Sequence, residues 1–255
     1  MIDRRELSSI ARQRKLTLII VEKDYVLGWV LFGLSTIPDI VLKGGTALSK
    51  VYFPQNWRFS EDLDFSTDRN DWTALSGQID SALTPTSGTS GIHFVRKSVH
   101  SNPRYLQLRI QYDAILQRNT LKIDITNEPT IGHVEKCAIP KSYSDYPDYV
   151  MSVQGREEIL AEKLRALIQR TKARDYYDAW RILEQGVDET RARNLFLRKI
   201  QFSQVRWTDI DDFFPKDLEP KLLLYWEDAL GRLVQPVPDM HSVLTELRNR
   251  LHWLK

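Results

Sequence analysis

Two short segments near the start of the chain carry residues that could bind a nucleotide. Gly44, Gly45 and Thr46 follow an apolar run, and backbone N–H groups at a glycine turn that opens a helix favour anions such as phosphate. Asp62 and Asp64 are two residues apart, so on a strand both carboxylates point to one face. Carboxylate oxygens on one face are ligands that Mg²⁺ prefers. Together the segments indicate phosphate chemistry beside a divalent cation.

Each segment taken alone has a simpler explanation. A glycine pair after a strand is more often only a turn, and Asp-x-Asp is common in surface loops. Leu63 and Phe65 alternate with the two acids, so this strand would have one apolar and one acidic face. A solvated edge strand would look similar, but it would not need glycines on the strand before it. The combination therefore favours a functional site.

Asp124 is a candidate third carboxylate. It lies in L-K-I-D-I-T, where strict alternation puts it on the face opposite to Ile123 and Ile125. A single Asp on a strand is usually only solvated. Nucleotidyl transfer, however, needs a base or a third metal ligand close to an Asp-x-Asp pair, with two metals roughly 4 Å apart binding the attacking and leaving oxygens.

Further candidates lie in a helical pattern downstream. Lys163 falls at the edge of the apolar stripe of a helix predicted over 156–170, where it could reach a cleft. Asp175 and Asp178 open the next helix. The simpler interpretation is a charged, exposed helix face, with acids favoured by the helix dipole.

The composition narrows the class of protein. The 255 residues allow one large domain or two small ones, and 42% hydrophobic with 27% charged residues is typical of a globular protein with a real core. A net charge of +2 gives no global argument for nucleic acid, so an RNA surface would have to be a local basic patch. Candidates for that patch are Arg165, Arg170, Lys172 and Arg174.

The single cysteine, Cys137, rules out an intrachain disulfide and fits a reducing compartment; it is expected to be a small buried hydrophobe rather than a nucleophile. The N-terminus lacks the apolar core of a signal peptide, and the longest apolar segment, 25–37, is too short to span a bilayer. We therefore expect a cytoplasmic protein with no membrane association. Zinc-type His/Cys spacing, G-x-S-x-G, P-loop and kinase signatures are missing from the sequence, which counts against those classes.

Hydrophobic periodicity predicts an α+β domain over residues 1–153 and a helical domain over 154–255. The predicted helices cover residues 3–14, 22–37, 46–52, 71–83, 156–170, 174 onward, 188–200, 215–233 and 240–253. The predicted strands cover residues 39–42, 62–66, 92–97, 105–112, 121–126 and 133–139, with loops at 54–59 and 84–91.

Four motifs occur in order along the chain: K-G-G-T-A-L-S-K, R-F-S-E-D-L-D-F, K-I-D-I and E-I-L-A-E-K-L-R-A-L-I-Q-R-T-K-A-R-D-Y-Y-D-A-W, with E-K-D-Y at 22–25 leading in. Over residues 20–185 the sequence resembles the AbiEii/AbiGii toxin family of nucleotidyltransferase-like proteins; the helices after 186 are not matched. The resemblance implies a nucleotidyltransferase fold of the polymerase-β type. This is a mixed sheet with flanking helices, followed by a helical C-terminal domain that closes the active-site cleft.

The resemblance also implies residue roles. Asp62, Asp64 and Asp124 would bind Mg²⁺, and Asp175 would act in metal or base positioning. The nucleotide would be contacted by Lys43, Gly44, Gly45, Thr46, Ser60 and Lys163. One departure is that many nucleotidyltransferases place Gly-Ser at a shorter interval before the acids.

The family consists of toxins of bacterial toxin–antitoxin and phage-defence (abortive-infection) systems. Characterised relatives add nucleotides from an NTP to tRNA 3′ ends, and an antitoxin is encoded alongside. We therefore expect a Mg²⁺-dependent, pyrophosphate-releasing nucleotidyltransferase with an RNA acceptor, the tRNA 3′ end, and a separately encoded antitoxin partner. Two alternatives stay open: transfer to a protein or small molecule, and a non-catalytic binding protein that acts through an antitoxin. The sequence does not determine which NTP is used or the oligomeric state.

Overall fold

The computed structural model describes residues 1–54 and 57–254, so part of the loop predicted over 54–59 lies outside the described residues. The chain divides into two compact units, Met1–Gln154 and Gly155–Lys255. Each unit has its own buried apolar residues.

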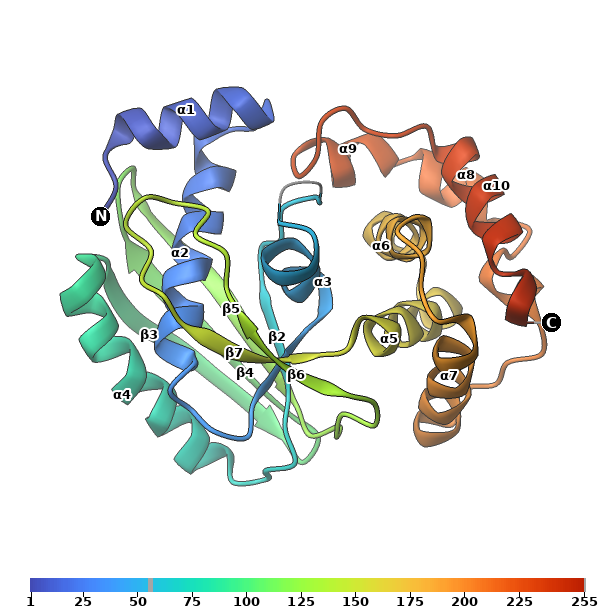
Figure 1. Cartoon of the computed structure of the whole chain (residues 1–255), viewed down its shortest axis with the longest axis horizontal. Helices are drawn as coiled ribbons and strands as arrows, with labels where there is room; N and C mark the ends of the chain where they lie inside the picture. Colours follow the sequence, from blue (N-terminus) through green and yellow to red (C-terminus); the bar gives the residue numbers. More distant parts are fainter. Residues whose placement is uncertain (55–56, 255) are drawn as a thin grey trace. The chain divides into compact units, whose positions relative to one another are not determined.

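Seven strands of the first unit form one mixed sheet in the order β3-β4-β5-β2-β1-β7-β6 (Figure 1). β2 runs parallel to β5 and β1 parallel to β7, whereas the other neighbouring pairs are antiparallel. This mixed sheet with flanking helices confirms the expected α+β class. The strands are β1 (Val41–Lys43), β2 (Leu63–Ser66), β3 (His93–Asn102), β4 (Tyr105–Asp113), β5 (Arg118–Thr126), β6 (Val134–Ala138) and β7 (Val150–Gln154).

Helices α2 (Leu18–Leu34) and α4 (Trp72–Ser90) lie against one face of this sheet (Figure 1). Every second side chain of β4, from Leu106 to Tyr112, is buried, while Arg109 between them is exposed. β5 shows the same alternation. The sheet therefore has an apolar face toward the helices and a polar face, and Asp124 is on the polar face as predicted.

Helix α2 follows α1 (Arg4–Arg14) and begins at Leu18, four residues before the predicted start. The prediction was wrong because it took the acidic residues at Glu22 as the first turn, whereas the apolar residues before them are already helical. Most of α2 is buried. Even so, no helix within residues 1–54 and 57–254 is long and apolar enough to cross a membrane.

Helix α4 continues to Ser90, so the loop predicted over 84–91 was wrong. Thr86 and Ser90 are buried, and their hydroxyls donate to the carbonyls four residues earlier, at 2.8 Å and 2.7 Å. Packing of this face keeps the helix together despite Pro85, which lacks an N–H group. The helix ends at Gly91, whose φ of 73° suits glycine.

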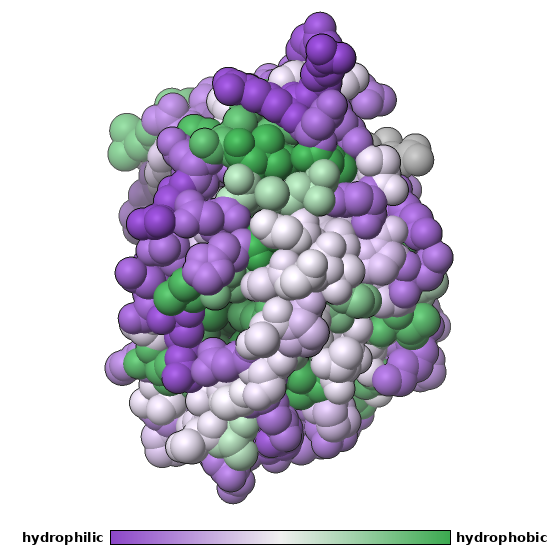
Figure 2. Space-filling view, turned by 90° about the vertical axis from the view of Figure 1, so that its left-hand side faces the viewer, coloured by the Kyte–Doolittle hydropathy of each residue, from purple (hydrophilic) through white to green (hydrophobic). Residues whose placement is uncertain are grey.

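The outer face of α4 is not an apolar patch. Figure 2 looks at the side of the molecule where α4 lies. It shows pale surface of near-neutral hydropathy through the middle, hydrophilic surface along much of the outline, and hydrophobic surface above the pale area and in smaller areas beside it. The Ser, Thr and Gly residues of α4 have such near-neutral hydropathy. Low-complexity sequence here reflects a solvated helix face rather than a loop.

Strand β7 was not predicted, because its five residues show no clear alternation and depend on pairing with β1 and β6. Cys137 on β6 is only half-buried, so the expectation of a buried cysteine was wrong. Burial and the nearby Glu135 carboxylate raise the pKa of the Cys137 thiol. The thiol form is therefore favoured, which agrees with the prediction that Cys137 is not a nucleophile.

The second unit is helical. A buried cluster joins α5 (Arg156–Gln169) and α7 (Glu189–Ser203), where Lys199 pairs with Glu158 at 2.9 Å and Glu162 at 2.8 Å. The prediction of a single helix over 215–233 was wrong, because two helices form there and are separated at Leu224 and Tyr225. The Tyr225 hydroxyl donates to the Thr171 carbonyl. The α-helices are α5 (Arg156–Gln169), α6 (Ala173–Glu184), α7 (Glu189–Ser203), α8 (Leu218–Leu223), α9 (Trp226–Gly231) and α10 (Met240–Arg250).

Candidate active site

A tight glycine turn connects β1 to the short helix α3 (Gly44–Ala47), which runs directly into the π-helix η1 (Leu48–Tyr52). Gly44 has a φ of 68°, a conformation that favours glycine. A Cβ on Gly44 would lie 2.8 Å from Asp64 Oδ2. A Cβ on Gly45 would lie 2.8 Å from Arg58 Nη2 and 3.3 Å from Ser60 Oγ. Both glycines are therefore required for close approach of the turn to the segment that carries the acids.

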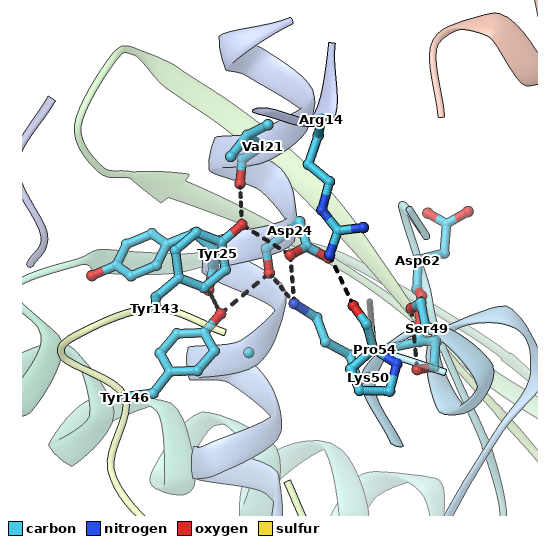
Figure 3. Close-up of polar contacts among 12 residues, drawn as sticks. Arg14, Val21, Asp24, Tyr25, Ser49, Lys50, Pro54, Asp62, Tyr143 and Tyr146 are labelled. Carbon is cyan, nitrogen blue, oxygen red and sulfur yellow. Dashed lines mark hydrogen bonds and ion pairs between the residues drawn. The ribbon is translucent and has the colours of Figure 1, made fainter. Parts of the chain in front are cut away.

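A buried ion pair holds the π-helix against α2 (Figure 3). Lys50 Nζ lies 2.6 Å from Asp24 Oδ2 and 2.9 Å from the Asp24 carbonyl, and its side chain is 2% exposed. The Tyr143 hydroxyl donates to the same carboxylate at 2.9 Å. The centre of the Tyr146 ring lies 5.9 Å from the Lys50 ammonium. A π-helical turn such as η1 often marks a functional site. This network fixes the segment that follows the glycine turn.

The turn is also tied to the first acid. Thr46, which is fully buried, donates its hydroxyl to the main-chain carbonyl of Asp62. Ser60 is also buried, and the short distance from its Oγ to a Cβ on Gly45 shows that it lies beside the turn. Lys43, at the end of β1, is also buried and pairs in register with Asp64. Thr46, Ser60 and Lys43, expected to contact a nucleotide, thus surround the glycine turn.

Two of the three predicted carboxylates, Asp64 and Asp124, lie on adjacent strands, and Asp62 directly precedes β2 rather than lying on it as predicted. Asp64 on β2 is directly opposite Asp124 on β5 in the parallel register, and Asp62 precedes Asp64 by two residues. Asp62 and Asp124 are partly exposed, with side-chain exposures of 35% and 21%. The sheet order, which the sequence did not reveal, is what brings Asp124 beside the Asp-x-Asp pair.

Two polar side chains that the sequence analysis missed contact these acids. Gln107 on β4 donates to Asp124 Oδ1 at 2.9 Å. Lys122 lies two residues before Asp124 on the same face of β5, with Nζ 2.8 Å from Asp124 Oδ2 and 3.9 Å from Asp62 Oδ2. The alternation of K-I-D-I already placed Lys122 and Asp124 on one face, and that signal could have identified the lysine.

Lys122 shows that a cation is stabilised where the acids converge. Burial would lower the pKa of Lys122, but the hydrogen bond to Asp124 and the charges of Asp62, Asp124 and Asp64 together raise it above its usual value. No group of three or more His, Cys, Asp or Glu side chains in the described part of the chain is arranged to hold a metal ion. Carboxylate oxygens are nevertheless the ligands that a hard divalent cation prefers. Metal binding by these acids stays a prediction.

The second unit holds a separate charged cluster on α5 and α6. Lys163 Nζ lies 3.0 Å from Asp175 Oδ1 and 2.8 Å from Asp178 Oδ2, and Arg170 Nε lies 2.8 Å from Asp175 Oδ2. Both acids are buried, and Asp175 lies in the first turn of α6, where the helix dipole also favours an acid. Burial would raise the pKa of Asp175, but Lys163 and Arg170 hold it well below its usual range. Asp175 is therefore an ionised, buried partner of Lys163.

A family model described as "Nucleotidyl transferase AbiEii toxin, Type IV TA system" matches residues 30–251. The chain belongs to this family. The match extends beyond residue 186, where the motifs alone gave no resemblance, and it makes the chain a nucleotidyltransferase toxin of the type IV toxin–antitoxin class. A comparison with curated proteins found no significant relative.

Solved structures with the same fold support the nucleotidyltransferase architecture. This AbiEii-family chain is similar to MenT4, the nucleotidyltransferase toxin Rv2826c from Mycobacterium tuberculosis H37Rv, with a TM-score of 0.74, 23% identity and coverage of 100% of this chain and 90% of that chain. It is also similar to JHP933 from Helicobacter pylori, with a TM-score of 0.63, 23% identity and coverage of 94% and 93%. At this level of identity the likeness shows the fold.

Proposed function

We propose that this AbiEii-family protein transfers a nucleoside monophosphate from an NTP to an RNA hydroxyl, the tRNA 3′ end, and releases pyrophosphate. The observation that carries the proposal is the juxtaposition of the glycine turn with the carboxylates: Gly44 closely approaches Asp64, which is paired in register with Asp124. An anion-binding turn beside converging acids is the arrangement that nucleotide phosphate chemistry requires.

In the proposed reaction an acceptor hydroxyl attacks the α-phosphorus, the bond to pyrophosphate breaks, and a carboxylate such as Asp124 takes the hydroxyl proton. Asp62, Asp64 and Asp124 would hold Mg²⁺, which would supply charge neutralisation on the triphosphate. The turn from Gly44 to Thr46 orients the phosphates, so positioning supplies much of the rate enhancement. The roles of Lys163 and Asp175 at the nucleotide stay predictions from the family resemblance.

An RNA acceptor is supported by a basic pocket within the second unit. A pocket of about 510 Å³ is lined by two basic residues, Arg170 and Arg206, by one acid, Asp212, and by polar and apolar side chains of residues 167–169, Thr171, Thr208 and Pro215. Arg206 is exposed, and guanidinium groups are suited to backbone phosphates. Arg165 of the predicted patch instead donates to the Ser203 hydroxyl. An antitoxin partner follows from the family class, and a cytoplasmic location stays a prediction.

Transfer of label from each NTP to total tRNA in the presence of Mg²⁺ tests the proposal. Asp62→Ala should reduce transfer at least about a hundredfold, the scale for losing one charge-stabilising group. Asp148→Ala is the matched control because the Asp148 side chain is 89% exposed and belongs to a surface ion pair. It should transfer label at the wild-type rate.

Three outcomes would contradict the proposal. An active Asp62→Ala variant would refute the role of the acids. Label that survives ribonuclease treatment would instead favour a protein or small-molecule acceptor. Lack of NTP binding in calorimetry, with and without Mg²⁺, would favour a non-catalytic protein that acts through its antitoxin.

A further inference from the structure

Lys122 differs from the other surface lysines of the sheet in what surrounds it. Its ammonium lies 2.8 Å from Asp124 Oδ2 and 3.9 Å from Asp62 Oδ2, and its side chain is 31% exposed. Asp124 Oδ1 on the other side accepts from Gln107, so the carboxylate is held from both sides. By comparison, Lys136 on β6 is an exposed strand lysine.

The position of this ammonium conflicts with binding of a second cation. The acids that contact Lys122 are those that would hold a divalent ion, so the ion and the ammonium compete for the same oxygens. A divalent cation bound to these oxygens would lie close to the Lys122 ammonium, and like charges repel each other strongly in a partly buried site. A lysine side chain has a flexible four-carbon stem, so the ammonium can leave the acids when a more favourable anion arrives. A triphosphate is such an anion.

We propose that Lys122 is the resident counter-ion of the carboxylate site, holding Asp62 and Asp124 in place and excluding a divalent cation until a nucleoside triphosphate arrives. The proposal rests on the proposed function. On nucleotide binding the ammonium turns to a phosphate oxygen, and the carboxylates become available to the cation. Lys122 is thus a positioning residue that couples metal binding to nucleotide binding, so the two ligands bind together rather than in either order.

Direct titration with Mn²⁺, followed by the electron paramagnetic resonance signal of the free ion, measures this coupling without any turnover. The titration is run with and without a non-hydrolysable NTP analogue, and a protein-free titration gives the Mn²⁺ that the analogue binds by itself. For the wild type, the analogue should strengthen Mn²⁺ binding about tenfold or more, within the usual range of coupling between sites. Lys122→Met should bind Mn²⁺ alone about tenfold more tightly than the wild type, and the analogue should add little.

Two variants control for folding and for charge. Lys122→Arg keeps the positive charge, so its Mn²⁺ affinity without nucleotide should stay close to that of the wild type. Lys136→Met removes an exposed strand lysine on β6 and should leave both titrations unchanged. Lys122→Met that binds Mn²⁺ alone no more tightly than Lys136→Met would overturn the inference.

Failure of the inference is distinguishable from failure of the proposed function. Equal Mn²⁺ binding by the wild type and Lys122→Met, both with the analogue present and without it, would overturn the role of Lys122 alone. If neither protein bound Mn²⁺ even with the analogue, the metal-dependent function would fail and the inference with it.

Discussion

The buried pair between Asp24 and Lys50 gives the sharpest test of how the glycine turn is held in place. The perturbation is Asp24→Asn, which keeps the shape of the side chain and removes its charge. Lys50 Nζ would lose an ion pair of 2.6 Å at a site where its side chain is 2% exposed. Burial lowers the pKa of Lys50 while the Asp24 charge raises it, so the buried ammonium depends on this carboxylate.

The expected cost is about 3 kcal/mol in the free energy of unfolding. Removal of one partner of a buried pair generally costs about 3–5 kcal/mol, because an uncompensated charge stays behind. We expect the lower end, because Lys50 keeps the main-chain carbonyl of Asp24 at 2.9 Å and the nearby rings of Tyr143 and Tyr146. Urea denaturation followed by circular dichroism measures the change.

The surface pair between Lys141 and Asp148 is a matched control. Its N–O distance is 2.8 Å, but its side chains are 48% and 89% exposed. Asp148→Asn should therefore change the unfolding free energy by less than about 1 kcal/mol. Similar costs for Asp24→Asn and Asp148→Asn would refute the argument, because burial is the main difference between the pairs.

A double-mutant cycle separates the pair from its surroundings. Lys50→Met, Asp24→Asn and the double variant should give a coupling of about 2 kcal/mol, since each single change leaves one charge without its partner. A coupling below about 0.5 kcal/mol would mean that the two residues act independently. Because η1 continues directly from α3, both single variants should also raise the KM for NTP.

Two further predictions concern the candidate site and the helical unit. Gly44→Ala should abolish most nucleotidyl transfer while the protein still folds, because its Cβ would lie 2.8 Å from Asp64 Oδ2 and its φ of 68° is strained for alanine. Asp175→Asn should reduce the sensitivity of the protein's stability to acid. The depressed pKa of Asp175 means that its ion pair with Lys163 stabilises the protein above about pH 4 and is lost as pH falls further.

The measurements for these variants are direct. Gly77→Ala is the control for the glycine change, since nothing lies within 4 Å of its added Cβ, and it should transfer label normally. Transfer by Gly44→Ala at the wild-type rate would contradict the close approach of the turn. For Asp175, unfolding free energies between pH 2 and 7 should fall with pH more steeply for the wild type than for Asp175→Asn. Parallel curves would show that Asp175 contributes nothing to the loss of stability as pH falls.

The sequence by itself determined those features of the protein that depend only on residues close together along the chain. The alternation of β5 placed Asp124 opposite to its apolar neighbours, because successive side chains of a strand point to opposite faces. Glycines 44 and 45 indicated a tight turn, and four ordered motifs indicated the family, which the family model confirmed. These features need no knowledge of which strand lies beside which.

Only the tertiary structure decided what those residues meet. The parallel pairing of β2 with β5 brings Asp64 to Asp124, and Lys122 then contacts Asp124 on β5 and Asp62 directly before β2. Likewise, burial of Thr86 and Ser90 keeps as helix a stretch whose composition predicts a loop. Strand pairing and side-chain burial involve residues far apart in the sequence. The free energy that they contribute can exceed the preference of a short segment for helix, strand or loop. The sequence could therefore name the acids, but only the folded sheet shows the lysine between them.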